Sequence, residues 1–301
     1  YDNHGTGVSD TGHVRIYQYD SGNDNWDKLG QDIDGEAADD ESGNSVSING
    51  DGTIVAIGAY YNDGTDTTGN AGHVRIYQYD SGNDIWNQLG QDIDGEASLD
   101  YSGTSVSINS DGTIVAIGAG NNDGTTTSGN YGHVRIYQYD SGNDIWNQLG
   151  QDIDGEAVND YSGPVSLSDD GTIVAIGAIG NDANGSLAGH TRIYQYDSIN
   201  DIWNQLGHDI DGEAADDRSG YSVSLSSDGS RVAIGAYQND GTGAGTEGHV
   251  RVYELETIVT SYVQVPKQVP LQIGTETQRL GYAADISGIV DISGALFTHG
   301  D

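Results

Sequence analysis

Cysteine and methionine are both absent from the 301-residue chain, and proline and phenylalanine are rare, with 3 copies and 1 copy. Without cysteine there is no disulfide bond, no thiol nucleophile and no cysteine-ligated zinc site. Methionine is missing even at position 1. This is typical of a processed piece of a longer precursor, from which we expect any secretion signal to have been removed. A chain of this length can bury a sufficient core without cross-links.

Basic residues are also scarce, with 10 Lys and Arg against 47 Asp and Glu, for a net charge of -37. A surface so acidic excludes nucleic acid as a partner and disfavours an anionic membrane, because both need basic side chains. No apolar run approaches the roughly 18 residues of a membrane-spanning helix, so we expect no direct membrane insertion. The charge favours solubility and divalent cations as counterions.

Glycine, by contrast, is abundant, with 46 copies, and it marks a repeat with a period of about 60 residues. Versions of "GHVRIYQYD" begin at Gly12, Gly72, Gly132, Gly189 and Gly248. A second marker, "SGNSVSINGDGTIVAIGA" at 42–59, has counterparts that begin at Ser102, Ser162 and Ser219. Such a period indicates an architecture built from copies of one structural unit.

Each period contains four strand-like segments, which in the first copy are 13–20, 26–33, 44–49 and 53–59. The last, "TIVAIGA", is apolar on both faces, as a fully buried strand is. Gly50, Asp51 and Gly52 have the chemistry of a hairpin turn. No segment shows an apolar rhythm of 3.6 residues. The sequence therefore predicts an all-β fold, a β-propeller of about five four-stranded blades.

Three known repeat families resemble this pattern over about residues 1–256. The stretch 51–90 resembles a kelch repeat, with small residues after a buried strand and a Tyr-Asp pair before a Trp. "SVSLSSDGSRVAIGA" at 222–236 is similar to the hairpin of WD repeats. The frame Ser-Gly … Gly-Ala resembles FG-GAP repeats, the blades of integrin α-subunit heads, although the Phe and the Pro are absent. The resemblance implies the propeller architecture.

We predict a single domain over 1–301, with four clear repeats within 1–256 and a degenerate fifth unit at 249–301. "LGYAADISGIVDISGALFTHGD" at 280–301 aligns with the stretch that begins at Ser219. The chain starts inside one unit, so strands from both termini are expected to close the ring. Strands around Tyr17 and Leu29 would then join those around Ile286 and Ile292. The alternative is completion by a second chain, which would give an open filament.

Acidic residues recur after the second strand of each unit at positions 1, 3, 5 and 9 of one loop. Alternating oxygens suit calcium, and the calcium loops of integrin-like blades resemble this spacing. Their glycine is at position 6, however, whereas here Gly35 is at position 4. The alternative is a turn whose acids are merely solvated. The predicted ligands are Asp32, Asp34, Glu36, Asp40, Asp92, Asp94, Glu96, Asp100, Asp152, Asp154, Glu156, Asp160, Asp209, Asp211, Glu213 and Asp217.

Histidine, arginine and tryptophan also recur at fixed positions in the repeat. We expect the arginines to make structural ties within or between blades through the loop acids, because guanidinium binds carboxylate well. We expect the tryptophans to pack between blades; sugar stacking is the alternative for them and for Tyr101, Tyr161 and Tyr221. One histidine per unit does not make a metal site alone. These columns are His13, His73, His133, His190 and His249; Arg15, Arg75, Arg135, Arg192 and Arg251; and Trp26, Trp86, Trp146 and Trp203.

No nucleophile elbow, zincin motif or phosphate loop is present in the sequence, and every acid cluster obeys the repeat, so we predict that the protein is not an enzyme. We expect an extracellular or cell-surface propeller for adhesion or assembly, with calcium on its acidic loops. A protein or glycan ligand would bind at a loop face, or the chain would self-assemble. The alternatives are a multivalent carbohydrate-binding lectin and a structural subunit of a surface filament.

Overall fold

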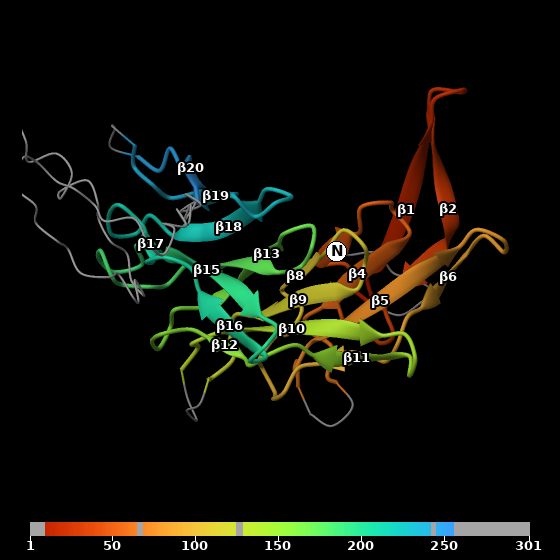
Figure 1. Ribbon diagram of the computed structural model, residues 1–301, viewed down its shortest axis with the longest axis horizontal. Helices are drawn as coiled ribbons and strands as arrows, with labels where there is room; N and C mark the ends of the chain where they lie inside the picture. The colour runs from red at the N-terminus through yellow and green to blue at the C-terminus, as the bar shows by residue number, and fades with distance from the viewer. Residues whose placement is uncertain (1–9, 65–68, 125–128, 242–244, 256–301) are drawn as a thin grey trace, which may run out of the picture. The chain divides into compact units, whose positions relative to one another are not determined.

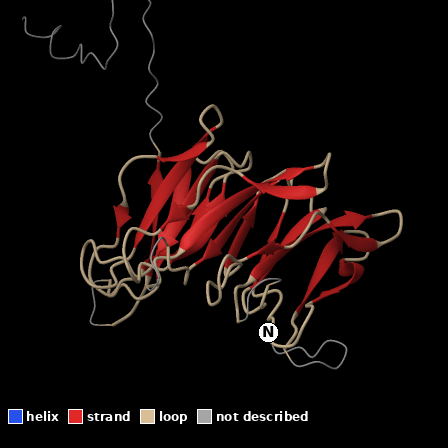
Figure 2. Ribbon diagram, turned by 90° about the horizontal axis from the view of Figure 1, so that it is seen from below, coloured by secondary structure: helices blue, strands red, loops and turns tan. Residues whose placement is uncertain are grey.

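The computed structural model describes residues 10–64, 69–124, 129–241 and 245–255. All regular elements there are β-strands, joined by loops and turns (Figure 2). No helix in this part of the chain is long and apolar enough to cross a membrane. The chain divides into two units, Tyr1–Glu256 and Thr257–Asp301, and the second lies outside the described residues. The predicted single domain over 1–301 therefore stays a prediction.

The strands form five antiparallel sheets, numbered here in chain order (Figure 1). Sheet 1 contains β1 (His13–Asp20) and β2 (Asn25–Asp34). Sheet 2 contains β3 (Ser45–Ile48), β4 (Ile54–Ala59), β5 (His73–Asp80), β6 (Ile85–Gln88) and β7 (Ile93–Asp94). Sheet 3 contains β8 (Ser105–Ile108), β9 (Ile114–Ala119), β10 (His133–Asp140), β11 (Ile145–Gln148) and β12 (Ile153–Asp154). Sheet 4 contains β13 (Ser162–Leu167), β14 (Ile173–Ala178), β15 (His190–Asp197), β16 (Ile202–Gln205) and β17 (Ile210–Asp211). Sheet 5 contains β18 (Ser219–Leu225), β19 (Arg231–Ala236) and β20 (His249–Glu254).

Each complete sheet is a meander of four strands in chain order, as in β3-β4-β5-β6, and this confirms the predicted four-stranded units. The predicted second strand of the repeat differs from its prediction. In sheets 2 to 4 it is divided, and the short β7 pairs with the start of β5 beside β6. Between β6 and β7 the chain turns at Gly90, whose φ of 73° is in the left-handed region that favours glycine. Asp94 and its counterparts in the other copies are therefore the last residues of short strands.

The strand with the sequence "IVAIGA" is at the centre of the packing. All residues of β4 and β9 are buried, as predicted for a strand covered on both faces. Each core cluster draws residues from neighbouring sheets. One of them joins Ile54 and Ile76 of sheet 2 to Val115 and Trp146 of sheet 3. The apolar core therefore lies between neighbouring sheets, as four clusters that each join two consecutive sheets.

Close packing between neighbouring sheets explains the Ser-Gly … Gly-Ala frame. A Cβ added at Gly118 would lie 1.9 Å from the carbonyl oxygen of Gly163 in the next copy. The serines of the innermost strands add hydrogen bonds across the same boundary: the amide of Ile108 donates to Ser47 Oγ at 3.0 Å, and that of Leu167 donates to Ser107 Oγ at 2.9 Å. Small residues recur because two backbones approach closely here.

The first and last described sheets are incomplete, with two and three strands. Both leave large apolar side chains exposed: Trp26 is 62% exposed, and Val250 and Val252 are 68% and 65% exposed. The predicted ring closure by strands around Ile286 and Ile292 lies outside the described residues, as does most of the predicted fifth unit. These remain predictions.

Candidate functional site: the acidic junctions between sheets

The arginine column connects each sheet to the loop of the preceding copy. Arg75 is 5% exposed, and its Nη2 donates to the backbone carbonyl of Asp34 at 2.8 Å. Its Nη1 lies 3.3 Å from Glu36 Oε1. Arg135, Arg192 and Arg251 repeat both contacts one copy later each time. The predicted structural ties are confirmed: these four arginines connect two copies, whereas Arg15 pairs with Asp32 of its own copy. A buried guanidinium needs such partners, because an unpaired buried charge is strongly destabilising.

The tryptophan column packs between sheets, as predicted, in three of its four copies. Trp86, Trp146 and Trp203 are each 3% exposed. The indole Nε1 of Trp146 donates to the carbonyl of Leu89 at 2.8 Å, and Gln91 holds the Trp146 backbone from the preceding loop. Trp26, which has no described sheet before it, is exposed. The tryptophans in the later copies are thus structural, and their rings are unavailable for sugar stacking.

The structure gives different partners to the four acids of one predicted calcium loop. The first acid accepts a hydrogen bond from a nearby glutamine, as Asp92 does from Gln88 at 2.6 Å. In the first copy Asp32 instead pairs with Arg15 and Lys28, and these cations hold the pKa of its carboxyl well below its usual range. The third position ends a strand opposite the histidine, as Asp94 does opposite His73. The fifth position is the glutamate that pairs with arginine.

The ninth position has an internal role in the loop. Asp100 is 4% exposed, and its Oδ2 accepts hydrogen bonds from the backbone amide of Ala97 and the side chain of Asn122, both at 2.9 Å. Burial raises the pKa of Asp100 above its usual value, and these hydrogen bonds oppose the shift. Asn62, Asn122, Asn181 and Asn239 make this contact to Asp40, Asp100, Asp160 and Asp217. The aspartate at position 9 therefore makes its hydrogen bonds inside the protein, to its own loop and to this asparagine.

The glycine at the fourth position of the loop also has a packing reason. A Cβ at Gly95 would lie 2.0 Å from the carbonyl oxygen of Ala71, and the amide of Gly95 donates to the carbonyl of Gly72 at 2.7 Å. Gly35 makes the equivalent approach to Thr11. This glycine is required by the contact between two backbone segments, so its position carries no information about a metal loop.

Possible metal-ligand geometry instead arises around the histidines, and three of the four groups there combine residues of two copies. Among the described residues, four groups of three possible ligands have their ligand atoms within 4.8 Å of one another. Each group is built around a buried histidine that the sequence prediction left aside. The groups are Glu36, His73 and Asp92; Glu96, His133 and Asp152; Glu156, Asp160 and His190; and His190, Asp209 and Asp211.

These groups contain half of the sixteen predicted ligands. The first two groups combine the glutamate at position 5 of one loop with the aspartate at position 1 of the next loop. The other two groups each use two acids of a single loop. The remaining predicted ligands are in no such group in the described part of the chain: Asp32, Asp34, Asp40, Asp94, Asp100, Asp154, Glu213 and Asp217. The sequence feature that could have indicated these groups of possible ligands was the histidine that occurs once in every repeat.

Burial sets the charge of this histidine. His73, His133 and His190 are at most 2% exposed, and desolvation lowers the pKa of each, that of His133 to about 4. The nearby arginine acts in the same direction. The same burial raises the pKa of Glu96 and of Asp154. At neutral pH the imidazoles are therefore neutral, with a lone pair available on one ring nitrogen.

Acidification should destabilise the protein through this column. An unfolded histidine takes up a proton below a pH of about 6.5, whereas folded His133 does so only near pH 4, so stability is lost as the pH falls between these values. From pH 7 to pH 5 we expect a loss of about 2 kcal/mol from His133 alone. Urea unfolding at both pH values, with EDTA present, should show a loss smaller by that amount in His133→Gln than in the wild type. Equal losses would contradict the prediction.

A known protein family has a repeat similar to part of this chain. Residues 33–77, from the end of β2 through β5, match the family model described as FG-GAP repeat. The chain carries an FG-GAP repeat. The matched stretch contains the first acidic loop and the Ser-Gly … Gly-Ala frame, and the later copies repeat both. The predicted resemblance is thus confirmed over residues 33–77, and the all-β fold of four-stranded antiparallel sheets is propeller-like, as predicted. No curated protein matches the chain.

Solved structures resemble the chain in fold. They include a putative 6-phosphogluconolactonase from Bacteroides fragilis, with 12% identity and a TM-score of 0.45 over 68% of this chain and 51% of that one. The periplasmic gluconolactonase of Pseudomonas aeruginosa has 12% identity and a TM-score of 0.45, over 81% of this chain and 65% of that one. The β-propeller domain of the trilobed protease from Pyrococcus furiosus has 10% identity and a TM-score of 0.40, over 70% and 53%. The chain thus spans between half and two thirds of their lengths, and such low identities concern the fold alone.

Proposed function

We propose that this FG-GAP repeat protein is a non-enzymatic module for adhesion or assembly outside the cell, with calcium bound by its acidic loops. The observation that carries the proposal is the repetition of one half-exposed carboxylate at four successive junctions. Glu36, Glu96, Glu156 and Glu213 are between 45% and 55% exposed, and each is held from one side by the arginine of the next copy. Equivalent sites in a row suit multivalent contact, where weak contacts add up to avidity.

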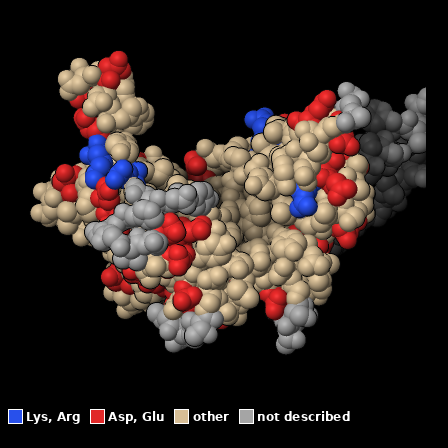
Figure 3. Space-filling view, turned by 180° about the vertical axis from the view of Figure 1, so that it is seen from behind, with Lys and Arg blue, Asp and Glu red and all other residues tan. Residues whose placement is uncertain are grey.

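Calcium fits the donor chemistry of these loops in part. Carboxylate oxygens are its preferred ligands, and it needs six to eight of them. The first acid of a loop uses one oxygen for a glutamine, as Asp152 does with Gln148, and the glutamates keep an exposed side. Figure 3 shows acidic side chains spread over the visible face and few basic ones. The net charge of -37 further favours cation uptake.

Calcium should therefore raise the melting temperature. A ligand at 100 times its Kd that binds only the folded state adds about 2.7 kcal/mol of stability. Calorimetric melting is compared in EGTA, in millimolar Ca²⁺ and in NaCl of equal ionic strength, because salt alone screens the acidic repulsion. The variant Asp92→Asn with Asp152→Asn should show a smaller calcium-specific rise. A melting temperature that changes no more with Ca²⁺ than with NaCl would refute calcium binding.

Adhesion is tested with latex beads that carry the chain. We expect Ca²⁺ to make the beads aggregate and EGTA to disperse them again, with albumin-coated beads as the control. Beads that stay dispersed in Ca²⁺ would argue against assembly between separate molecules of this chain. Light scattering of the free chain separates adhesion from the filament alternative, which a strictly monomeric profile would exclude.

A lectin is the second candidate, and contacts between tyrosine rings favour it. Tyr60 and Tyr61 have ring centroids 4.1 Å apart, and Tyr101 of the next copy is 5.5 Å from Tyr61. Tyr221 and Tyr237, 55% and 47% exposed, form a similar pair at 4.5 Å. Exposed aromatic faces can stack on sugars. A glycan array decides this alternative: retention that Tyr101→Ala abolishes would support a lectin, and an array without retained glycans would exclude it.

A further inference from the structure

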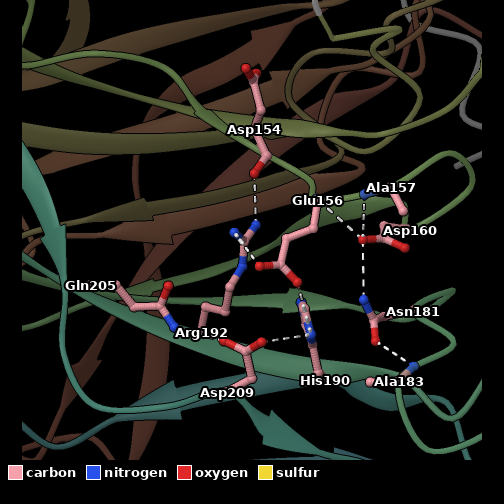
Figure 4. A network of polar contacts seen from close by, with 10 residues as sticks. All are labelled: Asp154, Glu156, Ala157, Asp160, Asn181, Ala183, His190, Arg192, Gln205 and Asp209. Carbon is pink, nitrogen blue, oxygen red and sulfur yellow. Dashed lines mark hydrogen bonds and ion pairs between the residues drawn. The ribbon is translucent and has the colours of Figure 1, made fainter.

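The junction around His190 contains buried polar atoms that have no hydrogen-bond partner. His190 is wholly buried, and neither of its ring nitrogens has a hydrogen-bond partner. Figure 4 shows the ring between Glu156 and Asp209. Its Nδ1 lies 3.9 Å from Glu156 Oε2 and 3.9 Å from Asp209 Oδ2, beyond the length of a hydrogen bond. A buried polar group without a partner is destabilising, by about 1–3 kcal/mol.

A second buried atom at this junction is also without a partner. Asp211 Oδ1 has no hydrogen bond, and Asp211 is one of the three residues whose ligand atoms lie within 4.8 Å of one another, with His190 and Asp209. Two independent side chains therefore lack a partner at one place. An ion between them would satisfy both.

The place is open to solvent on one side. A hollow of about 490 Å³ is lined by Glu156, Gln205, His208, Asp209 and Asp211, besides Gly207. His208 breaks the repeat, because the other copies have a glutamine at this position, Gln31, Gln91 and Gln151. A second imidazole thus lines the entrance to this junction.

We propose that His190, Asp209 and Asp211 bind a divalent transition metal ion. Ligands about 2.1 Å from one ion are about 3.4 Å apart at the tetrahedral angle and about 4.2 Å apart when opposite. The observed 3.9 Å between His190 Nδ1 and Asp209 Oδ2 falls between these limits. Glu156 and Asp160 form a separate group with His190 and do not join Asp209 and Asp211; the Oδ2 of Asp160 also accepts hydrogen bonds from Ala157 and Asn181.

The nitrogen ligand determines the class of metal. Calcium takes oxygen ligands, whereas imidazole combined with carboxylate suits zinc and its transition-metal neighbours. The site is independent of the proposed adhesion, and of calcium at the other acids.

The test is calorimetric titration of the full chain with Zn²⁺, after chelator treatment and dialysis, with Co²⁺ as a spectroscopic probe. We expect one tight site per chain, retained in excess Ca²⁺, and cobalt absorption bands typical of a low-coordinate nitrogen and oxygen site. Asp209→Asn and His190→Gln should each weaken Zn²⁺ binding by at least about tenfold. Asp152→Asn, the same position one copy earlier, is the matched control and should keep the tight site.

Melting in EDTA establishes that each variant folds, so that lost binding reports the site. If His190→Gln does not fold, Asp209→Asn alone carries the test, because Asp209 is only partly buried. Absence of tight Zn²⁺ binding in the wild type would overturn the proposal, and so would equal Zn²⁺ affinity in the wild type and Asp209→Asn. A failure of either kind leaves the calcium proposal unaffected, because that proposal is tested by melting in Ca²⁺ without Zn²⁺.

Discussion

Replacing Gly118 with alanine should cost about 3 kcal/mol or more in the free energy of unfolding, the largest effect that we expect from one methyl group in this protein. The added Cβ would lie 1.9 Å from the carbonyl oxygen of Gly163 and 2.8 Å from its carbonyl carbon. Both are backbone atoms of the next copy, so no side chain can rotate away. Sheets 3 and 4 would have to separate, which would disturb the core that they share.

Calorimetry or urea unfolding measures this loss, which corresponds to a melting temperature lower by roughly 6–12 °C in a domain of this size. Gly120→Ala is the matched control, because its Cβ would have no atom nearer than the carbonyl oxygen of Tyr161, at 3.8 Å. Gly177→Ala repeats the test at the next boundary, where the distance to the Gly220 oxygen is again 1.9 Å. A melting temperature of Gly118→Ala within about 2 °C of the control would contradict the close approach.

These glycines show what local sequence can and cannot predict. The repeat, the four strands and the buried "IVAIGA" strand follow from patterns a few residues long, and the structure confirms them. The reason for the Gly-Ala frame does not follow from them, because Gly118 meets Gly163 across two copies of the repeat. Propensity assigns glycine to a turn, whereas here it allows two backbones to touch inside the packed region.

Which acids come together also depends on contacts beyond a single repeat. The spacing of Asp92, Asp94, Glu96 and Asp100 predicted one loop around one ion, as though the loop curled on itself. In the structure Asp94 ends a strand and Asp100 closes the loop from inside. Glu96 instead meets His133 of the next copy, with His133 Nδ1 3.8 Å from Glu96 Oε2. Which carboxylates come together depends on how sheets stack, and a single repeat does not contain that information.

Tryptophan shows that identical local sequence has different energetic weight in different copies. Trp146 and Trp26 occupy the same position of the repeat, each near a tyrosine ring of the neighbouring strand at 5.2 Å and 5.5 Å. Only Trp146 has a described sheet before it, and it is 3% exposed where Trp26 is 62% exposed. Its ring lies against the backbone of Gly90, where an added Cβ would come within 2.7 Å of the indole.

Trp146→Ala should therefore cost about 3–5 kcal/mol, the range for removing a buried tryptophan, whereas Trp26→Ala should cost under about 1 kcal/mol. Truncation at Trp146 leaves a cavity between sheets 2 and 3 and removes the hydrogen bond to Leu89. Urea unfolding of the two variants and the wild type measures the difference. Similar small losses would refute the packing role of Trp146. Similar large losses would show that Trp26 is covered after all, as closure of the ring or a second chain would require. Light scattering then separates these two cases, because closure within one chain leaves a monomer and completion by a second chain does not.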